Sequence, residues 1–524
     1  MAAKTTSREK ACKCGKQACK CAKPAAKKNA PAAKALPRAA FIGMGIQSRT
    51  MLLPQFVANP GVVVATICDC DRVRRDAGAK FVNEAYAKDE AKKAYAGVCK
   101  AEADFRNVIK DKSIDMVVIV TPDHWHAYMA VEAMKAGKDV YCEKPLTYSV
   151  EEAKLVMAAQ KKFKRVFQTG AWQRSRREFR TAAMIVRNGL IGDVKYVDCN
   201  YGNAAAQDNA DISNFHDNLG GPSHPHRFFC QWDDAAHKVQ SIADESAPNP
   251  DVDWNMWLGP APWSPYSDQC APRGVHNFFP MFWRFDDNYG TGYNGDWGAH
   301  HLDIAQWGLD LDKSGPVKIL RSDKPNSVNP LHGGRRQCGM KFVFANGAVI
   351  YHNPFSVWGT VFYGTKGIVA VNRGKIAVWK GRGVKPTDKI RAELADNSYK
   401  GMKQVAAFYG RDWGKETNVQ VGEGLVETLD ALDKAFNLDS APVQLYKSDS
   451  QTGNFIECCR TRKATISPAE TGARAAILCQ LCNISYVYDV SFDWDPKKND
   501  FANGTGDPDW LRRPCYRNGW DVKL

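Results

Sequence analysis

Long apolar runs are missing from this sequence: no stretch of about 18 apolar residues occurs, which excludes a membrane-spanning helix. Heptad repeats, a collagen-like glycine period and internal repeats are absent as well. There is also no phosphate-cradling Walker motif and no Gly-x-Ser-x-Gly nucleophile elbow. The 524 residues do contain 15 Trp, 23 Phe and 18 Tyr, which need buried cores. The sequence therefore predicts a globular protein of roughly two to four domains.

Excess positive charge is scarce outside the first 38 residues. The formal net charge is +15, but residues 1–38 hold 11 Lys or Arg and one acid, which leaves +5 for the rest. A nucleic-acid-binding protein needs a basic face on its folded part, so we expect no nucleic-acid partner. The few apolar side chains of residues 1–38 predict a disordered tail. This tail lacks the apolar segment of a secretory signal, so we expect a cytoplasmic protein.

The 17 cysteines are scattered over the chain, which favours a reducing compartment over a disulfide framework. Four of them form two C-x-C pairs in the tail: Cys12, Cys14, Cys19 and Cys21. Because this is not zinc-finger spacing, we expect no metal site there. Cys479 and Cys482 form a C-x-x-C within a helical stretch, which predicts buried apolar packing rather than redox chemistry. His224 and His226 have no carboxylate or cysteine at ligand spacing, so no metal is expected at this pair either.

A dinucleotide-binding pattern begins directly after the tail. An apolar run at residues 38–42 ends in Gly43-Met44-Gly45-Ile46-Gln47-Ser48, and a helix-compatible stretch follows at residues 49–58. A second apolar run at residues 62–67 ends at Asp69. This order of strand, glycine turn, helix, strand and acid is typical of a dinucleotide site.

Each residue type in this pattern has a physical role. Gly43 permits the tight turn, and Gly45 lets the backbone approach a pyrophosphate bound at the helix N-terminus. Asp69 would accept hydrogen bonds from the ribose 2′-hydroxyl and would repel a 2′-phosphate, which favours NAD as the cofactor. The nearby Arg72 and Arg74 leave NADP open.

Strands and helices continue to alternate up to residue 169. Apolar strands are expected at residues 115–120, 139–142 and 165–169, with a helix between each pair. This alternation predicts a doubly wound parallel sheet, whose ligands bind at the carboxyl ends of the strands. The residues expected to bind the cofactor are Gly43, Gly45, Ile46, Gln47, Asp69, Thr121, Pro122, His126, Glu143 and Lys144.

Four motifs together resemble the glucose-fructose oxidoreductase / inositol dehydrogenase / rhizopine-catabolism (Gfo/Idh/MocA) family. They are Gly43-x-Gly45, Thr121-Pro122-x-x-x-His126, Glu143-Lys144-Pro145 and Asp296-Trp297-Gly298-Ala299-His300. The resemblance covers residues 39–524, and the C-terminus is similar to that of a long bacterial branch. It implies an α/β protein with a Rossmann domain at 39–170, an α+β substrate-binding domain at 171–490 and a C-terminal arm at 491–524. The second domain would carry a large, open, mainly antiparallel sheet and support a homo-oligomer, a dimer or tetramer.

The same resemblance implies an NAD(P)-dependent dehydrogenase of a sugar or polyol, with Lys144, Asp296 and His300 as catalytic residues. The residue types suit this chemistry. Residues at i and i+4 of a helix share a face, so Asp296 and His300 can point into one cleft. Histidine has a pKa suited to accepting the hydroxyl proton, and Lys144 would stabilise a developing alkoxide. Asp296 would orient His300 or bind a neighbouring hydroxyl.

An aromatic-rich insert at about residues 203–295 suits a sugar, whose C–H faces stack on rings while its hydroxyls need polar partners. The expected substrate contacts are Trp172, Arg174, Arg284, Trp297 and His301.

Two other functions stay open. The first is an NAD-dependent glycosidase, for which the family offers precedent, acting through transient oxidation at C3 and elimination. The second is a non-catalytic sugar or cofactor sensor. Retention of both Lys144 and His300 argues against a sensor, which needs no proton-handling pair.

Overall fold

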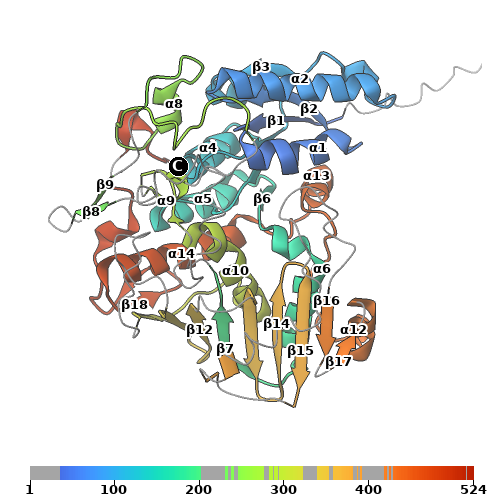
Figure 1. Cartoon of the computed structure of the whole chain (residues 1–524), viewed down its shortest axis with the longest axis vertical. Coiled ribbons are helices and arrows are strands. Elements are labelled where there is room, and N and C mark those ends of the chain that lie inside the picture. The colour runs from blue at the N-terminus through green and yellow to red at the C-terminus, as the bar shows by residue number, and fades with distance from the viewer. Residues whose placement is uncertain are drawn as a thin grey trace, which may run out of the picture. The chain divides into compact units, whose positions relative to one another are not determined.

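The five apolar runs predicted between residues 38 and 169 lie in one parallel sheet, as expected (Figure 1). The sheet has six strands, because the polar segment at residues 100–102, which was not predicted, adds an edge strand. Its strand order β3-β2-β1-β4-β5-β6 is that of a dinucleotide-binding Rossmann fold. The strands are β1 (Arg38–Ile42), β2 (Val63–Cys68), β3 (Lys100–Glu102), β4 (Met116–Ile119), β5 (Asp139–Cys142) and β6 (Phe167–Thr169). Every residue of β2, β4 and β5 is buried, because helices cover both faces of a sheet of this kind.

The helices of this part begin where the sequence offers a capping side chain. Asp71 accepts a hydrogen bond at the start of α2 (Arg72–Lys88), and Ser149 does so at the start of α5 (Val150–Phe163). The other helices are α1 (Leu53–Ala58), α3 (Phe105–Lys110) and α4 (Asp123–Lys135). The stretch predicted as one helix at 49–58 differs, since a π turn, η1 (Ser48–Leu52), precedes α1. Pro54 has no N–H to donate to the preceding turn, so the helix winds more loosely there.

A second sheet of eleven strands has the order β17-β16-β15-β14-β13-β7-β12-β11-β10-β18-β19. Its pairs are antiparallel except β7–β12 and β15–β16, which confirms the prediction of a mainly antiparallel sheet. The strands are β7 (Val194–Cys199), β10 (Lys318–Leu320), β11 (Lys341–Val343), β12 (Val349–His352), β13 (Thr360–Gly364), β14 (Gly367–Asn372), β15 (Lys375–Lys380), β16 (Asn418–Val421), β17 (Gly424–Val426), β18 (Phe492–Asp495) and β19 (Asp500–Ala502). A separate hairpin joins β8 (Gln231–Asp233) to β9 (Lys238–Gln240).

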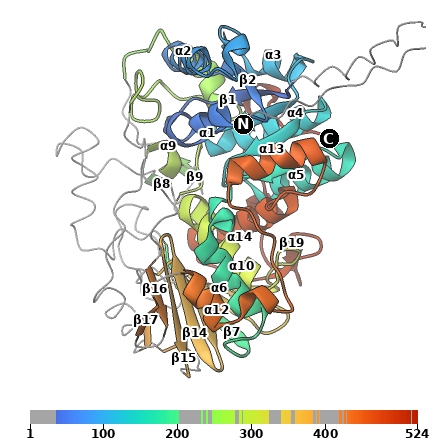
Figure 2. The ribbon, with the colours of Figure 1, turned by 90° about the vertical axis from the view of Figure 1, so that its right-hand side faces the viewer.

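Helices from the second half of the chain fill the space between the two sheets (Figure 2). The long helix α14 (Ala469–Tyr488) packs on α5 of the Rossmann part and on α10 (Ala299–Gly308). In turn, α10 packs on β13 and β7, and α6 (Arg177–Arg187) packs on β14. Cys479 and Cys482 of α14 are buried and are free thiols, as predicted. One continuous cluster of buried apolar side chains therefore joins both sheets.

The C-terminal residues do not stand apart as an arm. Strands β18 and β19 extend the edge of the second sheet, and Trp520 packs against Phe105 and Trp125 of the Rossmann part. Arg513 forms a buried ion pair with Glu152 of α5. Residues 37–524 accordingly form a single compact unit.

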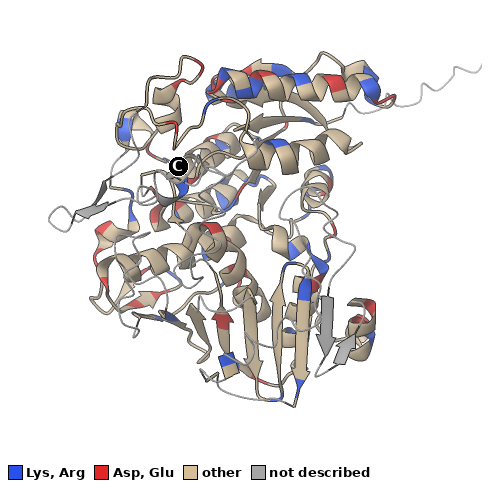
Figure 3. Cartoon of the chain, viewed as in Figure 1, with Lys and Arg blue, Asp and Glu red and all other residues tan. Residues whose placement is uncertain are grey.

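This computed structural model describes residues 36–201, 231–233, 238–240, 246–276, 282–286, 288–292, 294–322, 339–352, 358–381, 386–387, 390–391, 418–421, 424–426, 429–514 and 516–524. The predictions for the tail cysteines, for His224 and His226 and for nearly half of the aromatic-rich insert lie outside these ranges. No helix within them is both long and apolar enough to cross a membrane. Positive and negative side chains are interspersed along the outer helix α2 (Figure 3).

Candidate functional site

A cavity of about 1200 Å³ lies at the carboxyl ends of β1, β2, β4 and β5. Its other walls come from α8 (Trp254–Leu258), α9 (Phe282–Phe285), η5 (Asn294–Gly298), the β14–β15 turn and the start of α13 (Gln451–Thr461). Pockets for a single small ligand usually measure about 300–1,000 Å³. This cavity therefore has room for an extended ligand together with a second, smaller one.

The two glycines of the first turn have different surroundings. Gly43 has φ +93°, its N–H donates to the Cys68 carbonyl at 2.8 Å, and a Cβ there would lie 2.5 Å from the Val120 carbonyl oxygen. The fold itself therefore requires glycine at this position. A Cβ on Gly45 would meet no protein atom within 4 Å. Gly45 borders the cavity, so the absence of a side chain there leaves room for a ligand, whereas the packing of the protein does not require it.

Polar groups line the same end of the cavity. The Asp69 carboxylate accepts backbone N–H bonds from Met44 at 2.6 Å and from Asp71 at 2.8 Å, which fixes it at the end of β2. Thr121 Oγ1 is buried and has no hydrogen-bond partner among the described residues. The fixed Asp69 carboxylate suits the ribose of a dinucleotide. The Thr121 hydroxyl and the open backbone at Gly45 leave polar groups and space for the rest of the dinucleotide, including its pyrophosphate. The residues present thus fit NAD.

A segment from the middle of the chain, residues 249–276, closes this end of the cavity, and we call it the closing segment. The Arg72 N–H donates to the Asp251 carbonyl at 2.8 Å, and the two side chains also form an ion pair. The Arg49 guanidinium donates to the His276 carbonyl at 2.7 Å. Side chains of the closing segment line the cavity: Val252, Met256, Trp257, Cys270 and His276. The cofactor end is consequently covered by residues far away in sequence.

Most of the predicted cofactor residues line the cavity: Gly43, Gly45, Ile46, Gln47, Asp69, Thr121, Pro122, Glu143 and Lys144. The prediction that His126 binds the cofactor is corrected, because His126 is buried and does not line the cavity. Its Nε2 lies 2.9 Å from the Thr121 carbonyl oxygen and its Nδ1 lies 2.7 Å from the Pro145 carbonyl oxygen. The first turn of α4 points His126 into the fold, so it bridges the two strand-end turns that bear site residues instead of contacting a ligand.

Glu143 lies at the end of β5 and is almost fully buried. Its Oε1 accepts hydrogen bonds from Trp172 Nε1 at 3.1 Å and from the Tyr141 hydroxyl at 3.3 Å. Burial raises the pKa of Glu143 despite these donors. A Cβ on Gly170 would lie 2.6 Å from the Glu143 carboxylate, so glycine at 170 makes room for this acid.

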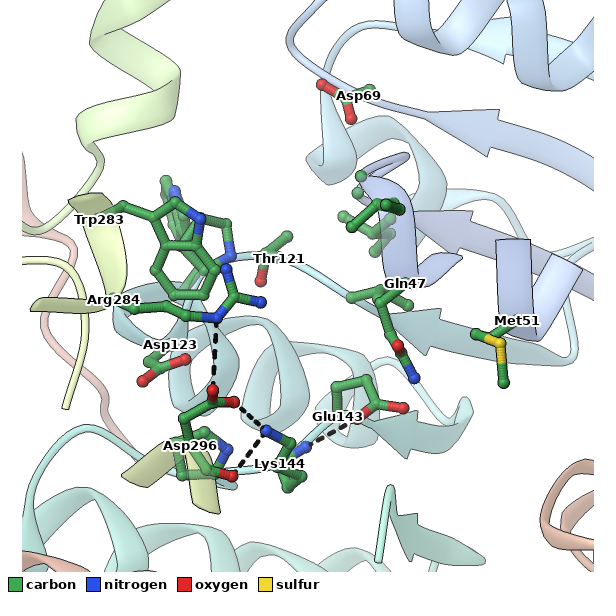
Figure 4. A pocket seen from close by; sticks show the side chains of 18 of the residues that line it. Gln47, Met51, Asp69, Thr121, Asp123, Glu143, Lys144, Trp283, Arg284 and Asp296 are labelled. Atoms are coloured by element: carbon green, nitrogen blue, oxygen red, sulfur yellow. Dashed lines mark hydrogen bonds and ion pairs between the residues drawn. The ribbon is translucent and has the colours of Figure 1, made fainter. Parts of the chain in front are cut away.

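Lys144, Asp296 and Arg284 form a charged chain across the cavity (Figure 4). Lys144 Nζ donates to the Asp296 backbone carbonyl at 2.8 Å and to its carboxylate. Arg284 Nε lies 3.8 Å from the other carboxylate oxygen. Burial alone would raise the pKa of Asp296, but Lys144 and Arg284 outweigh it and lower that pKa. Because an ammonium has three donors, Lys144 keeps one N–H for a ligand.

His300 lines the cavity beside this chain. Burial, Arg373 and Lys144 together lower its pKa well below the ordinary value, so the imidazole is neutral near pH 7. Its Nδ1 has no hydrogen-bond partner among the described residues. The prediction that Asp296 orients His300 is corrected, because the side-chain bonds of Asp296 within the described chain go to Lys144 and Arg284. Asp296 lies in the π turn η5, where a spacing of four residues no longer stacks two side chains.

Three of the predicted substrate contacts line the cavity: Trp172, Arg284 and Trp297. Arg174 does not, although it follows Trp172 by only two residues. Its guanidinium is 2% exposed and makes paired bonds to the carboxylates of Asp303 and Asp312, each at 2.7 Å at its shortest. The side chains of Trp172 and Arg174 leave the short helix η3 (Trp172–Ser175) in different directions, so Arg174 forms ion pairs within the protein instead of lining the cavity.

The prediction that His301 contacts the substrate is also corrected, because His301 does not line the cavity. It is 1% exposed, stacks on Trp297 with ring centroids 6.0 Å apart, and lies 3.4 Å from Thr360 Oγ1. Burial lowers its pKa to about 3. One residue further along α10 than His300, it points toward the second sheet and supports Trp297 from behind.

Asp123, Gln173 and Arg373 are among the cavity-lining residues that the sequence analysis missed. Asp123 accepts both the backbone N–H and the hydroxyl of Thr291, and burial raises its pKa to about 7. Both polar ends of the buried Gln173 amide lack hydrogen-bond partners among the described residues, which marks it as a ligand contact. Asp123 directly follows the Thr121-Pro122 motif and could have been found, whereas only tertiary packing places Arg373.

Fold and cavity together define a two-part α/β protein with a dinucleotide-binding Rossmann domain. Residues 37–171 match a model described as "Oxidoreductase family, NAD-binding Rossmann fold", and residues 229–353 match its "C-terminal alpha/beta domain". The chain therefore belongs to the Gfo/Idh/MocA oxidoreductase family, as its motifs predicted. Within the described residues, no group of three or more His, Cys, Asp or Glu is arranged to hold a metal ion.

Several known proteins are similar to this chain. A glycosyl hydrolase family 109 protein of Saccharopolyspora erythraea is 34% identical over 160 residues, which is 30% of this chain and 33% of that protein. An uncharacterized oxidoreductase YrbE of Bacillus subtilis is 37% identical over 90 residues, 17% of this chain and 26% of that protein. This chain thus spans about a third of the first relative's length. Aldose-aldose oxidoreductase from Caulobacter crescentus superposes with a TM-score of 0.48 at 15% identity, over 88% of this chain and all of that one.

Proposed function

We propose that this protein is an NAD-dependent dehydrogenase of a sugar or polyol, which transfers a hydride between a carbinol carbon and the cofactor. One observation carries the proposal. Lys144, Asp296 and the neutral His300 line the same cavity as the glycine turn at residues 43–45. We include in it the cytoplasm as the compartment and a homo-oligomer, a dimer or tetramer, as the assembly.

The protein's own groups can handle the proton that accompanies hydride transfer. NAD, when bound, supplies the hydride acceptor. The neutral imidazole of His300 has a lone pair that can take the hydroxyl proton. The remaining N–H of Lys144 would hold the same oxygen and stabilise its growing negative charge. Asp296 holds the Lys144 ammonium in position, and the alcohol leaves as a ketone.

NAD rather than NADP is supported by the charges at the ribose end. The Asp69 carboxylate is fixed by two backbone N–H groups and borders the cavity, where it would repel a 2′-phosphate. Arg72 pairs with Asp251. Arg74 pairs with Asp71 at 3.2 Å and also binds the Pro272 carbonyl. Both arginines, which left NADP open in the sequence, are engaged in holding the closing segment.

An NAD-dependent glycosidase is the second candidate, and two observations favour it. Relatives that are 30–34% identical over about a third of their length are named glycosyl hydrolase family 109 proteins. The closing segment also covers the cofactor end, which suits a cofactor that is restored in every cycle instead of exchanged. In such a cycle, oxidation of a carbinol acidifies the neighbouring C–H, a base removes that proton, the glycosidic oxygen leaves, water adds, and the hydride returns.

One assay separates these functions. The full-length protein is incubated with NAD and a panel of inositols, free sugars and aryl glycosides while NADH and released aglycone are both followed. A Lys144→Ala variant should lose about 10³-fold in kcat, because it removes the group that stabilises the developing alkoxide. As a matched control, Lys154→Ala removes a lysine paired with Glu151 on the outer face of α5.

The readouts give distinct outcomes. Net NADH that depends on Lys144 supports the dehydrogenase. Aglycone release without net NADH, also dependent on Lys144, contradicts it in favour of the glycosidase. NAD binding with neither product, across the whole panel, favours a sensor that binds sugar or cofactor without turnover.

A further inference from the structure

The chain ends beside α4 of the Rossmann part (Figure 1), and we call residues 513–514 and 516–520 the C-terminal strap. Arg513 anchors the beginning of the strap. Its guanidinium donates to Glu152 of α5 at 3.3 Å and to the His124 carbonyl of α4 at 3.2 Å. The side chains of Arg513 and Glu152 are each only 2% exposed, so water barely weakens this ion pair. The beginning of the strap is therefore fixed to the Rossmann part.

Trp520 anchors the other end of the strap, behind a wall of the cavity. Its ring centroid lies 5.1 Å from that of Trp125 and 5.9 Å from that of Phe105. Trp125 and Phe105 line the cavity, whereas Trp520 does not. The strap thus packs against this wall without reaching the cavity itself.

Between these two anchors, Arg517 binds the end of α8 in the closing segment. Its backbone N–H donates to the Pro260 carbonyl at 3.0 Å, and its Nε donates to the Ala261 carbonyl at 3.0 Å. Its two terminal nitrogens donate to Asn255, to Oδ1 at 2.6 Å and to the carbonyl at 2.9 Å. Carbonyl groups at the end of a helix lack partners within the helix, and an arginine side chain can supply them. Arg517 therefore makes four hydrogen bonds to one short stretch of the closing segment.

Helix α8 forms part of the cavity wall through Met256 and Trp257. The carbonyl groups of both residues accept hydrogen bonds from Trp125 Nε1 at 3.1 Å. A Cβ on Gly259, where α8 ends, would lie 2.2 Å from the Trp125 ring, so the backbone of the closing segment lies directly on this indole. Arg517 thus holds in place an element that encloses the cofactor end of the cavity.

We propose that Arg517 is a positioning residue for the cofactor, which keeps α8 closed over bound NAD and so limits the rate of cofactor exchange. NAD then enters and leaves when α8 moves away from Trp125, and the hydrogen bonds of Arg517 must break for that movement. Neither Arg517 nor Asn255 lines the cavity, so both act on the cofactor through α8. This inference concerns cofactor exchange alone and applies to a dehydrogenase and a glycosidase alike.

The test follows the release of NADH from the full-length protein. The protein is loaded with NADH, mixed with excess NAD, and followed by stopped-flow fluorescence. Arg517→Ala should release NADH about tenfold faster than wild type, because it removes charge-assisted hydrogen bonds that oppose opening. The same bonds hold α8 in the free protein, so association should accelerate by a similar factor and Kd should stay within about twofold.

Stability separates this role from a general loss of structure. The bonds from Arg517 to Asn255 are exposed to solvent, so the melting temperature of Arg517→Ala should stay within about 3 °C of wild type. Arg517→Lys should recover part of the slow release, because an ammonium can still donate to one carbonyl. Arg512→Ala is the matched control, since its side chain is 62% exposed and lies 3.9 Å from Asp509, and it should change neither rate. Wild-type release from a folded Arg517→Ala protein, or a raised Kd with unchanged association, would overturn the proposal.

Asn255→Ala decides the question if Arg517→Ala does not fold. It removes one acceptor of Arg517 and leaves the backbone carbonyl in place. We expect release about threefold faster than wild type, with no further increase when Asn255→Ala is added to Arg517→Ala, since both changes remove the same bond. Unchanged release, or rates that multiply in the double variant, would contradict the role of Arg517. No sugar is needed, so the result is independent of whether the protein oxidises any substrate.

Discussion

The two regions that meet at the cavity collect their site residues in different ways. In the cofactor region, residues 37–171, the lining groups directly follow strands of one parallel sheet: Gly43 follows β1, Asp69 follows β2, and Thr121 and Glu143 lie just beyond β4 and β5. In the substrate region the lining groups come from α9, η5, α10, the β14–β15 turn and η3. A topological rule places the first set, whereas tertiary packing alone places the second.

This difference explains why neighbours in sequence share a role in one region and separate in the other. At a strand end, consecutive side chains stay at the same edge of the sheet. Along η3 and α10, side chains one or two residues apart can diverge, so Trp172 and His300 border the cavity while Arg174 and His301 are enclosed in the core. Substitutions in the two regions test this difference.

The largest expected effect on stability belongs to Arg174. Replacing it by Met leaves the buried carboxylate of Asp303 and the partly exposed carboxylate of Asp312 without their cation, which should lower the free energy of unfolding by about 3–5 kcal/mol. Denaturant unfolding measures this change, and NAD affinity should stay the same. Trp172→Phe is the comparison, since it loses only the bond to Glu143 and should affect ligand binding more than stability. A stable Arg174→Met protein with a raised sugar KM would restore Arg174 as a substrate contact.

The next effect concerns Asp123, the buried acid at the start of α4. Its folded pKa is about 7, raised by burial above the usual 3.8, so the stability that the protonated Asp123 contributes is fully present below about pH 4 and is lost as the pH rises from there to about 7. Asp123→Asn keeps an acceptor for Thr291 without the charge. It should therefore gain stability relative to wild type between pH 4 and 8, by up to about 4 kcal/mol. Thermal unfolding across that range measures it, and a constant difference at every pH would disprove the assignment.

A smaller effect distinguishes the two glycines of the cofactor turn. Gly43→Ala forces a Cβ against the Val120 carbonyl at a positive φ, which should cost about 1–3 kcal/mol of stability as well as NAD affinity. Gly45→Ala meets no protein atom, so its melting temperature should equal that of wild type while its NAD Kd rises about tenfold or more. Thermal unfolding and calorimetric titration measure the two quantities. Equal losses of stability in both variants would mean that the fold requires glycine at position 45 as well.

The sequence predicted more of the cofactor region than of the substrate region. Five of the six strands of the Rossmann part could be predicted, because a glycine turn, apolar runs and an acid after the second strand are local signals. The short polar strand β3 carries no such signal. Lys144 and Asp296 were found through their motifs, but their pairing with Arg284 was not. Arg373 carries no local signal at all, because a β-turn arginine looks the same whether it faces a cavity or solvent. His126 was misread because burial on the inner side of α4 is decided by what packs there.

The smallest effect tests whether the closing segment retains the cofactor. Arg72 pairs with Asp251 on that segment at 2.6 Å and with Asp76 on its own helix at 3.7 Å, and it is largely exposed. An exposed pair adds little to stability, so Asp251→Ala should leave the melting temperature unchanged. It should still speed NADH release about two- to fivefold, because the segment must lift for the cofactor to leave. Stopped-flow fluorescence measures the rate, and Asp76→Ala, which removes the other partner of the same arginine, should not change it. Equal release from both variants would show that the cofactor leaves without moving this segment, and would weaken the case for a cofactor that stays bound through each cycle.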